Sequence, residues 1–170
     1  GMGTNHHYGY QVQDIYATAW LLRNEIFASR NCANIIATLQ YWSALSETRK
    51  PCQKNRDELL DTWHTLLMPK MVSALMFKDE RKKIQALKGL ARWVSTSLVY
   101  TNGTLGGIKI DGTAFHHGGF YPAYTIGATA TLGRFVNFVN GTSFALPLSA
   151  RKVFRSALEA LRNYSTMYEW

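Results

Sequence analysis

Two adjacent histidines and two tyrosines occur within fourteen residues of this 170-residue chain, in the stretch DGTAFHHGGFYPAY from Asp111 to Tyr124. The histidines are His116 and His117, and the tyrosines are Tyr121 and Tyr124. Imidazole and phenol groups transfer protons, and imidazole also binds metal ions. The residues of this stretch could therefore serve two kinds of chemistry, metal binding and acid–base catalysis.

Metal binding is the weaker of the two interpretations. The chain has five histidines, and four of them form the doublets His6–His7 and His116–His117. Adjacent side chains point in different directions along a regular backbone, and neither doublet shows the spacing of paired zinc ligands on a helix. We therefore expect these histidines to hold no metal ion.

Hydrolytic chemistry also fits the sequence poorly. Paired catalytic carboxylates need two acidic residues facing one cleft, but the chain has only 11 Asp and Glu residues and most lie in amphipathic helical segments. No GxSxG turn is present to place a nucleophilic serine beside a histidine. A glycosidase or serine hydrolase site is therefore not predicted.

β-Elimination at a uronic acid suits these residues better. In this reaction a proton leaves the carbon beside the carboxylate, and the glycosidic oxygen departs from the neighbouring carbon. The site needs a group that neutralises the carboxylate, a base and an acid; one tyrosine can serve as both where cationic neighbours lower its pKa from about 10. His117, Tyr121 and Tyr124 supply these groups, although loop tyrosines also occur as packing and a lone histidine as a hydrogen-bonded anchor.

The formal net charge of +8 favours an anionic partner, because clustered lysine and arginine side chains attract polyanions. Nucleic acid, acidic lipid and acidic polysaccharide all satisfy this criterion. Basic residues also commonly solvate helix faces. A non-catalytic, polyanion-binding helical module is therefore the second functional hypothesis.

Cysteine usage and hydropathy give little information on the cellular compartment. Cys32 and Cys52 form neither a CxxC pair nor a disulfide framework, so each is expected to be a small buried residue. No apolar run approaches the roughly 20 residues of a membrane helix, and the N-terminus lacks the residue order of a signal peptide.

Apolar residues at spacings of three and four predict helices over most of the chain. Pro69 should kink or split one of them, and Asp79 can cap the start of another. From Thr101 to Pro122 the chain is rich in glycine and has no helical period, which predicts one long loop without strands. The predicted helical segments are residues 12–27, 35–45, 56–77, 80–98, 126–136 and 153–161.

The predicted fold class is all-α. Short connections between consecutive helices favour antiparallel helical hairpins, which can close as a bundle, stack as a solenoid or form a ring. The GMG at residues 1–3 is typical of a cloning remnant, and the chain stops at Trp170 without a helix cap. We expect residues 1–170 to be a single all-α domain taken from a longer protein.

Two motifs resemble the chondroitin sulfate ABC lyases. The stretch DGTAFHHGGFYPAY is similar to the catalytic loop of that family, DGTAWRHEGNYPGY, and keeps the second histidine, the YP pair and the final tyrosine. NHHYGYQVQD, which begins at Asn5, is similar to THWGYSSR. The similarity extends over nearly the whole chain but is strong only in these two motifs.

The resemblance implies part of an incomplete toroid of helical hairpins from a lyase of chondroitin and dermatan sulfate. His117 would neutralise or orient the uronate carboxylate, and Tyr124 would act as base and acid to give a Δ4,5-unsaturated product. His7, across the groove, would be the base for the epimeric iduronate. Further substrate-binding positions implied by the family are His116, Tyr121, Gln13 and Asn5.

The sequence departs from the family motifs at three positions, so the preferred uronic epimer and sulfation pattern stay open. The family has arginine at the positions of His116 and Gln13 and glutamate at that of Gly118. Its catalytic arginine and glutamate would lie beyond Trp170, so residues 1–170 alone are expected to be inactive.

The resemblance also implies an acidic polysaccharide as partner, with neither nucleic acid nor a membrane, and a periplasmic or secreted location. No cofactor is expected in this segment. A divalent cation such as calcium or magnesium is left open for the complete enzyme, as is its oligomeric state.

Overall fold

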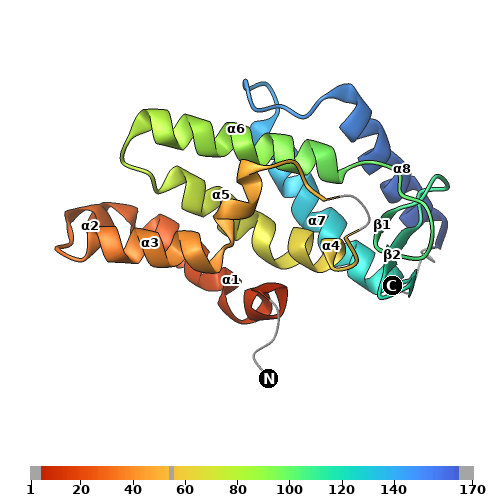
Figure 1. Ribbon diagram of the computed structural model, residues 1–170, viewed down its shortest axis with the longest axis horizontal. Coiled ribbons are helices and arrows are strands. Elements are labelled where there is room, and N and C mark those ends of the chain that lie inside the picture. Colours follow the sequence, from red (N-terminus) through yellow and green to blue (C-terminus); the bar gives the residue numbers. More distant parts are fainter. Residues whose placement is uncertain (1–4, 54–55, 165–170) are drawn as a thin grey trace.

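The computed structural model describes residues 5–53 and 56–164, and in these ranges the protein is built mainly from helices (Figure 1). The side chains of residues 5–7 lie outside the description. Helices α5 and α6 pack against each other, as do α7 and α8. The predicted all-α class is confirmed, whereas closure of the hairpins into a toroid stays a prediction.

The N-terminal helices differ in their bounds from the predicted ones. Helix α1 spans Asn5–Leu21, α2 spans Arg23–Ala28 and α3 spans Cys32–Trp42, followed by the 3-10 helix η1 at Leu45–Arg49. The break at Leu22 divides the segment predicted as one helix. Helices α1, α3 and α5 share an apolar cluster of buried residues: Val12, Tyr16, Ala19, Leu39, Val72 and Met76.

The segment around Pro69 forms two α-helices with a π-helical joint, as the proline predicted. Helix α4 spans Leu59–Asp61, the π-helix η2 spans Thr62–Leu66, and α5 spans Leu67–Leu75. Proline lacks the N–H that would bond the carbonyl four residues earlier, here that of Thr65. The wider π turn falls on the residues that lose this bond, a place where such turns commonly occur.

Helix α6 spans Glu80–Ser97, α7 spans Pro122–Val139 and α8 spans Leu148–Tyr164. The prediction of a capped start for α6 is confirmed, because the Asp79 side chain accepts a hydrogen bond of 3.0 Å from the Lys82 backbone N–H. Among the described residues, no helix has both the length and the apolar character needed to span a membrane.

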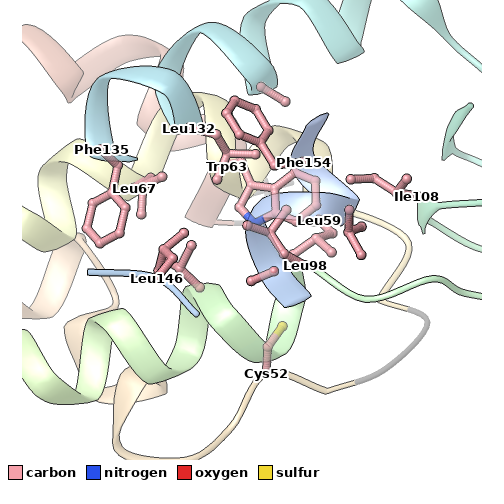
Figure 2. Packing of buried hydrophobic residues seen from close by; sticks show 14 of the residues in the cluster. Cys52, Leu59, Trp63, Leu67, Leu98, Ile108, Leu132, Phe135, Leu146 and Phe154 are labelled. Carbon is pink, nitrogen blue, oxygen red and sulfur yellow. The ribbon is translucent and has the colours of Figure 1, made fainter. Parts of the chain in front are cut away.

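The main core lies where α4, η2, α6, α7 and α8 meet (Figure 2). Trp63 is buried there, and its indole N–H donates a 3.0 Å hydrogen bond to the Ser97 hydroxyl. This bond satisfies the one polar group of a large buried side chain. Cys32 and Cys52 are free and buried, as predicted.

The segment predicted as a loop without strands contains a small antiparallel sheet, so that prediction was wrong. Strand β1 is Gly107–Ile108, β2 is Ala114–His116 and β3 is Gly119–Phe120. These strands have two or three residues, too few for an alternating pattern to be recognised. The sheet lies beside the start of α4 and of α7 (Figure 1).

Candidate functional site

The segment 56–66 includes α4 and η2, and it contacts strand β2 and helices α1 and α7. Two glycines allow neighbouring helices to approach it closely. A Cβ on Gly9 of α1 would overlap the Thr65 side chain, and a Cβ on Gly127 of α7 would come within 2.6 Å of the His64 ring. Helices α1 and α7 therefore pack on η2 at positions that only glycine fits.

Gly9→Ala is expected to destabilise the chain by about 1–3 kcal/mol, because the Thr65 side chain is buried and cannot move away from an added methyl group. Urea unfolding followed by tryptophan fluorescence measures this change. Gly133→Ala in α7 is the matched control: its added methyl group would lie 3.9 Å from the nearest atom, on Phe154, and should be neutral or stabilising. Equal effects of the two substitutions would contradict this packing.

A tight β-hairpin presents the two histidines. His116 pairs with Gly119 across strands β2 and β3, which leaves His117 and Gly118 as the two turn residues. Both have positive φ, 51° and 75°, as a type I′ turn requires. The left-handed conformation of His117 returns its ring toward that of His116, and the ring centroids lie 3.9 Å apart. The expected divergence of neighbouring side chains does not occur here.

His116 is fully buried, because it occupies an inward-facing position of β2. Its Nδ1 lies 3.0 Å from the Asp57 carbonyl oxygen, and its Nε2 lies 3.4 Å from Asp61 Oδ2. A carbonyl oxygen only accepts hydrogen bonds, so Nδ1 is the donor of the first contact. The ring therefore lies beneath the surface on which a substrate would bind.

His117 and Tyr124 both contact this buried ring and are both partly exposed. The His117 side chain is 47% exposed, and Tyr124, in the first turn of α7, is 36% exposed. The Tyr124 ring lies 4.5 Å from that of His116, and the Tyr121 ring meets Tyr124 edge-on at 5.6 Å. The structure thus brings together all four aromatic positions that the sequence singled out in this stretch.

Two further residues near the hairpin, Tyr10 and His64, were not predicted as part of the site. The Tyr10 hydroxyl donates a 2.7 Å hydrogen bond to Asp61 Oδ1, and its ring meets the His64 ring edge-on at 5.3 Å. Burial, followed by the hydrogen bond and charge of Asp61, raises the pKa of Tyr10. Burial lowers the pKa of His64. Both groups are therefore neutral near pH 7.

The N-terminal motif is described only in part. Asn5 and His7 lie in the first turns of α1, but their side chains are outside the described residues, so their predicted roles stay predictions. Gln13 is half-buried further along α1. Tyr10 provides the described contact between this motif and the surroundings of the hairpin.

Three side chains of the site could hold a metal ion. Asp57, His116 and His117 each offer one ligand atom, and these atoms lie within 4.8 Å of one another. His117 Nδ1 is 3.4 Å from Asp57 Oδ2. Carboxylate and imidazole are ligands for several divalent metals. The absence of a metal ion at these histidines thus stays a prediction, although the two neighbouring rings lie together instead of diverging.

The family described as "Lyase, catalytic" matches this chain over residues 1–170. The chain belongs to this lyase family. The family resemblance seen in the two motifs is therefore confirmed, and the hairpin with its neighbouring tyrosines lies within a lyase catalytic domain.

Three curated relatives of this lyase-family chain carry specific names. A chondroitin sulfate ABC exolyase from Bacteroides thetaiotaomicron is 30% identical over 162 residues, which cover 95% of this chain and 16% of that protein. A chondroitin sulfate ABC exolyase from Proteus vulgaris is also 30% identical over 162 residues, covering 94% and 16%. A chondroitin sulfate ABC endolyase from Proteus vulgaris is 23% identical over 164 residues, covering 95% and 16%. The chain spans about a sixth of the length of these relatives.

Proposed function

We propose that this chain forms one side of the active site of a glycosaminoglycan lyase, which cleaves chondroitin or dermatan sulfate by β-elimination. The observation that carries the proposal is that His117 and Tyr124 are both partly exposed and both contact one buried ring. The names of the relatives support the substrate class. Dermatan sulfate and the unsaturated product rest on the motif resemblance.

His117 acts on the uronate carboxylate. Its ring stands at the tip of the hairpin turn, and Asp57 Oδ2 lies 3.4 Å from its Nδ1. A proton held on Nδ1 by this carboxylate leaves Nε2 free to face the substrate, and a protonated ring can donate from both nitrogens. A donor aimed at the carboxylate stabilises the negative charge that develops there when the adjacent carbon loses its proton.

Tyr124 moves the proton. Its deprotonated oxygen takes the proton from C5, and the electrons of that C–H bond form the C4=C5 double bond while the bond from C4 to the glycosidic oxygen breaks. The same proton then passes from Tyr124 to the departing oxygen. No water is consumed, and Tyr124 returns to its starting state. His7 at the start of α1 is the proposed base for iduronate.

The charge of the chain supports an acidic polysaccharide as the partner. A groove of about 1490 Å³ runs between η1 and α6, apart from the proposed reacting groups, since neither His117 nor Tyr124 lines it. Its acidic residue, Glu47, is already within 4 Å of two cations, Lys70 and Arg56. The remaining charged side chains that line this groove are basic: Arg49, Arg81, Lys82, Lys88 and Arg92.

His117→Asn tests the proposed role of the imidazole. Asparagine tolerates the left-handed turn conformation, so the hairpin should be kept while the ring is lost. In the complete protein that carries these residues, kcat/KM on chondroitin sulfate should fall by about 10²- to 10⁴-fold. The rate is read from the ultraviolet absorbance of the unsaturated uronate. Thr104→Ala, an exposed change in the same segment, is the control; unchanged activity of His117→Asn would contradict this role.

A further inference from the structure

Among the described aromatic residues of the hairpin and of the start of α7, His116 alone contacts both His117 and Tyr124. The ring centroid distances are 3.9 Å to His117 and 4.5 Å to Tyr124. It also meets the Tyr121 ring edge-on at 6.3 Å. A fully buried ring with these contacts touches the proposed reacting groups without reaching the surface on which they act.

One hydrogen bond and one close approach to a carboxylate restrain the His116 ring. Nδ1 is tied to the Asp57 carbonyl at 3.0 Å, and Nε2 faces Asp61 Oδ2 at 3.4 Å. These partners lie on opposite edges of the ring, so rotation about the side-chain bonds would lose both contacts. Nε2 is buried and makes no hydrogen bond among the described residues, so the bond from Nδ1 to the Asp57 carbonyl is the stronger of the two restraints on the ring.

Asp61 links the His116 ring to helix α1. Its other carboxylate oxygen accepts the 2.7 Å hydrogen bond from Tyr10, and the carboxylate itself is almost completely buried. A continuous row of contacts therefore runs from Tyr10 through Asp61 to His116, and from there to the two exposed rings. It connects the N-terminal motif to the hairpin, and its first two members, Tyr10 and Asp61, are 51 positions apart in the sequence.

We infer that His116 is a positioning residue of the proposed elimination site, which orients His117 and Tyr124 toward the uronate, and that Asp61 and Tyr10 hold it in place. The inference rests on the proposed function. It gives the N-terminal motif a role in this site through Tyr10, separate from any role of His7.

The test uses His116→Phe, Asp61→Asn and Tyr10→Phe in the complete protein with chondroitin sulfate as substrate. His116→Phe keeps a ring of similar size but removes both polar contacts. A displacement of the reacting groups by about 1 Å costs about 10²-fold in rate, so kcat should fall by that order while KM stays within about twofold. Asp61→Asn should lower kcat in the same way, and Tyr10→Phe to a smaller extent.

A double variant distinguishes a connected row from independent contributions. If Asp61 acts through His116, then Asp61→Asn adds little to the loss already caused by His116→Phe. Ser73→Ala is the control for general destabilisation, because it removes a buried 3.1 Å hydrogen bond to the Leu39 carbonyl away from the site. Its unfolding midpoint should fall with kcat unchanged.

Each outcome decides a separate point. Unchanged kcat in His116→Phe, or a raised KM with kcat unchanged, would overturn the positioning role, the latter because it indicates direct substrate contact. If His116→Phe does not fold, unchanged kcat in both Asp61→Asn and Tyr10→Phe overturns it instead. An active Tyr124→Phe protein would overturn the proposed function itself, whatever the His116 variants show.

Discussion

Tyr124→Phe in the complete protein is expected to lower kcat on chondroitin sulfate by about 10²- to 10⁴-fold, the range for removal of a general acid–base group. Phenylalanine keeps the ring that packs 4.5 Å from His116, so the fold of the hairpin and of the start of α7 should not change. Only the hydroxyl that carries the proton is lost. Initial rates of ultraviolet absorbance measure kcat, and calorimetric titration with the inactive variant measures whether the polysaccharide still binds.

Tyr100→Phe is the matched control for this substitution. Tyr100 precedes the sheet and is 42% exposed, and its hydroxyl donates a 3.1 Å hydrogen bond to Ser156 rather than to a residue of the site. Loss of this exposed hydroxyl should leave kcat unchanged. A Tyr124→Phe protein as active as Tyr100→Phe would show that proton transfer does not pass through Tyr124.

The second large effect is expected on stability, from Lys70→Met. Lys70 is fully buried, and its ammonium donates to the Ser43 and Ala44 carbonyls at 2.7 and 3.0 Å. Ala44 has a φ of 52°, so the lysine also holds an uncommon left-handed turn just after α3. Its loss removes the buried donor of this turn, and a buried acceptor left unmet costs about 1–3 kcal/mol. Urea unfolding of the variant should show a decrease of this order.

Lys78→Met is the matched control, since Lys78 also donates to a carbonyl, that of Phe27 at 2.8 Å, but is exposed. Its effect should be within about 0.5 kcal/mol. Equal losses in the two variants would show that burial of the Lys70 contacts is not what stabilises this turn.

Lys70 also predicts a pH dependence of stability. Burial lowers its pKa from 10.5 to about 8, against the opposing effect of Glu47. Between these values the unfolded chain binds more protons at Lys70 than the folded chain, so the free energy of unfolding rises with pH in this window. The stability of the wild type relative to Lys70→Met should therefore increase from pH 8 to about 10.5. A decrease over this range would contradict the assigned direction.

The helices were predictable where a regular apolar face packs on the core. The start of α1 was missed by seven residues because the motif NHHYGYQ has few aliphatic side chains, and its packing depends on Gly9 meeting η2. The joint before Pro69 followed from the chemistry of proline, but its π-helical form did not. The three strands were missed because neighbouring elements, not an alternating pattern, hold them.

The sequence predicted only those residues of the site that belong to its motifs. His117 and Tyr124 were recognisable from their residue types and from the family motif. Asp57 and Asp61 gave no signal, because acidic residues at the start of an amphipathic helix usually lie in solvent. Their importance arises from contacts across 51 to 60 residues of sequence. Likewise, the burial of His116 depends on which face of a three-residue strand it occupies.

We propose that the carbon–oxygen bond is broken by elimination at the site of His117 and Tyr124. The most direct measurement is digestion of chondroitin sulfate by the complete protein in oxygen-18 water, followed by mass spectrometry of the products. Elimination predicts products without oxygen-18 at the cleaved ends, with new ultraviolet absorbance, and the loss of both products and absorbance in Tyr124→Phe. One oxygen-18 atom per cleavage without new absorbance would show hydrolysis and contradict the proposed mechanism.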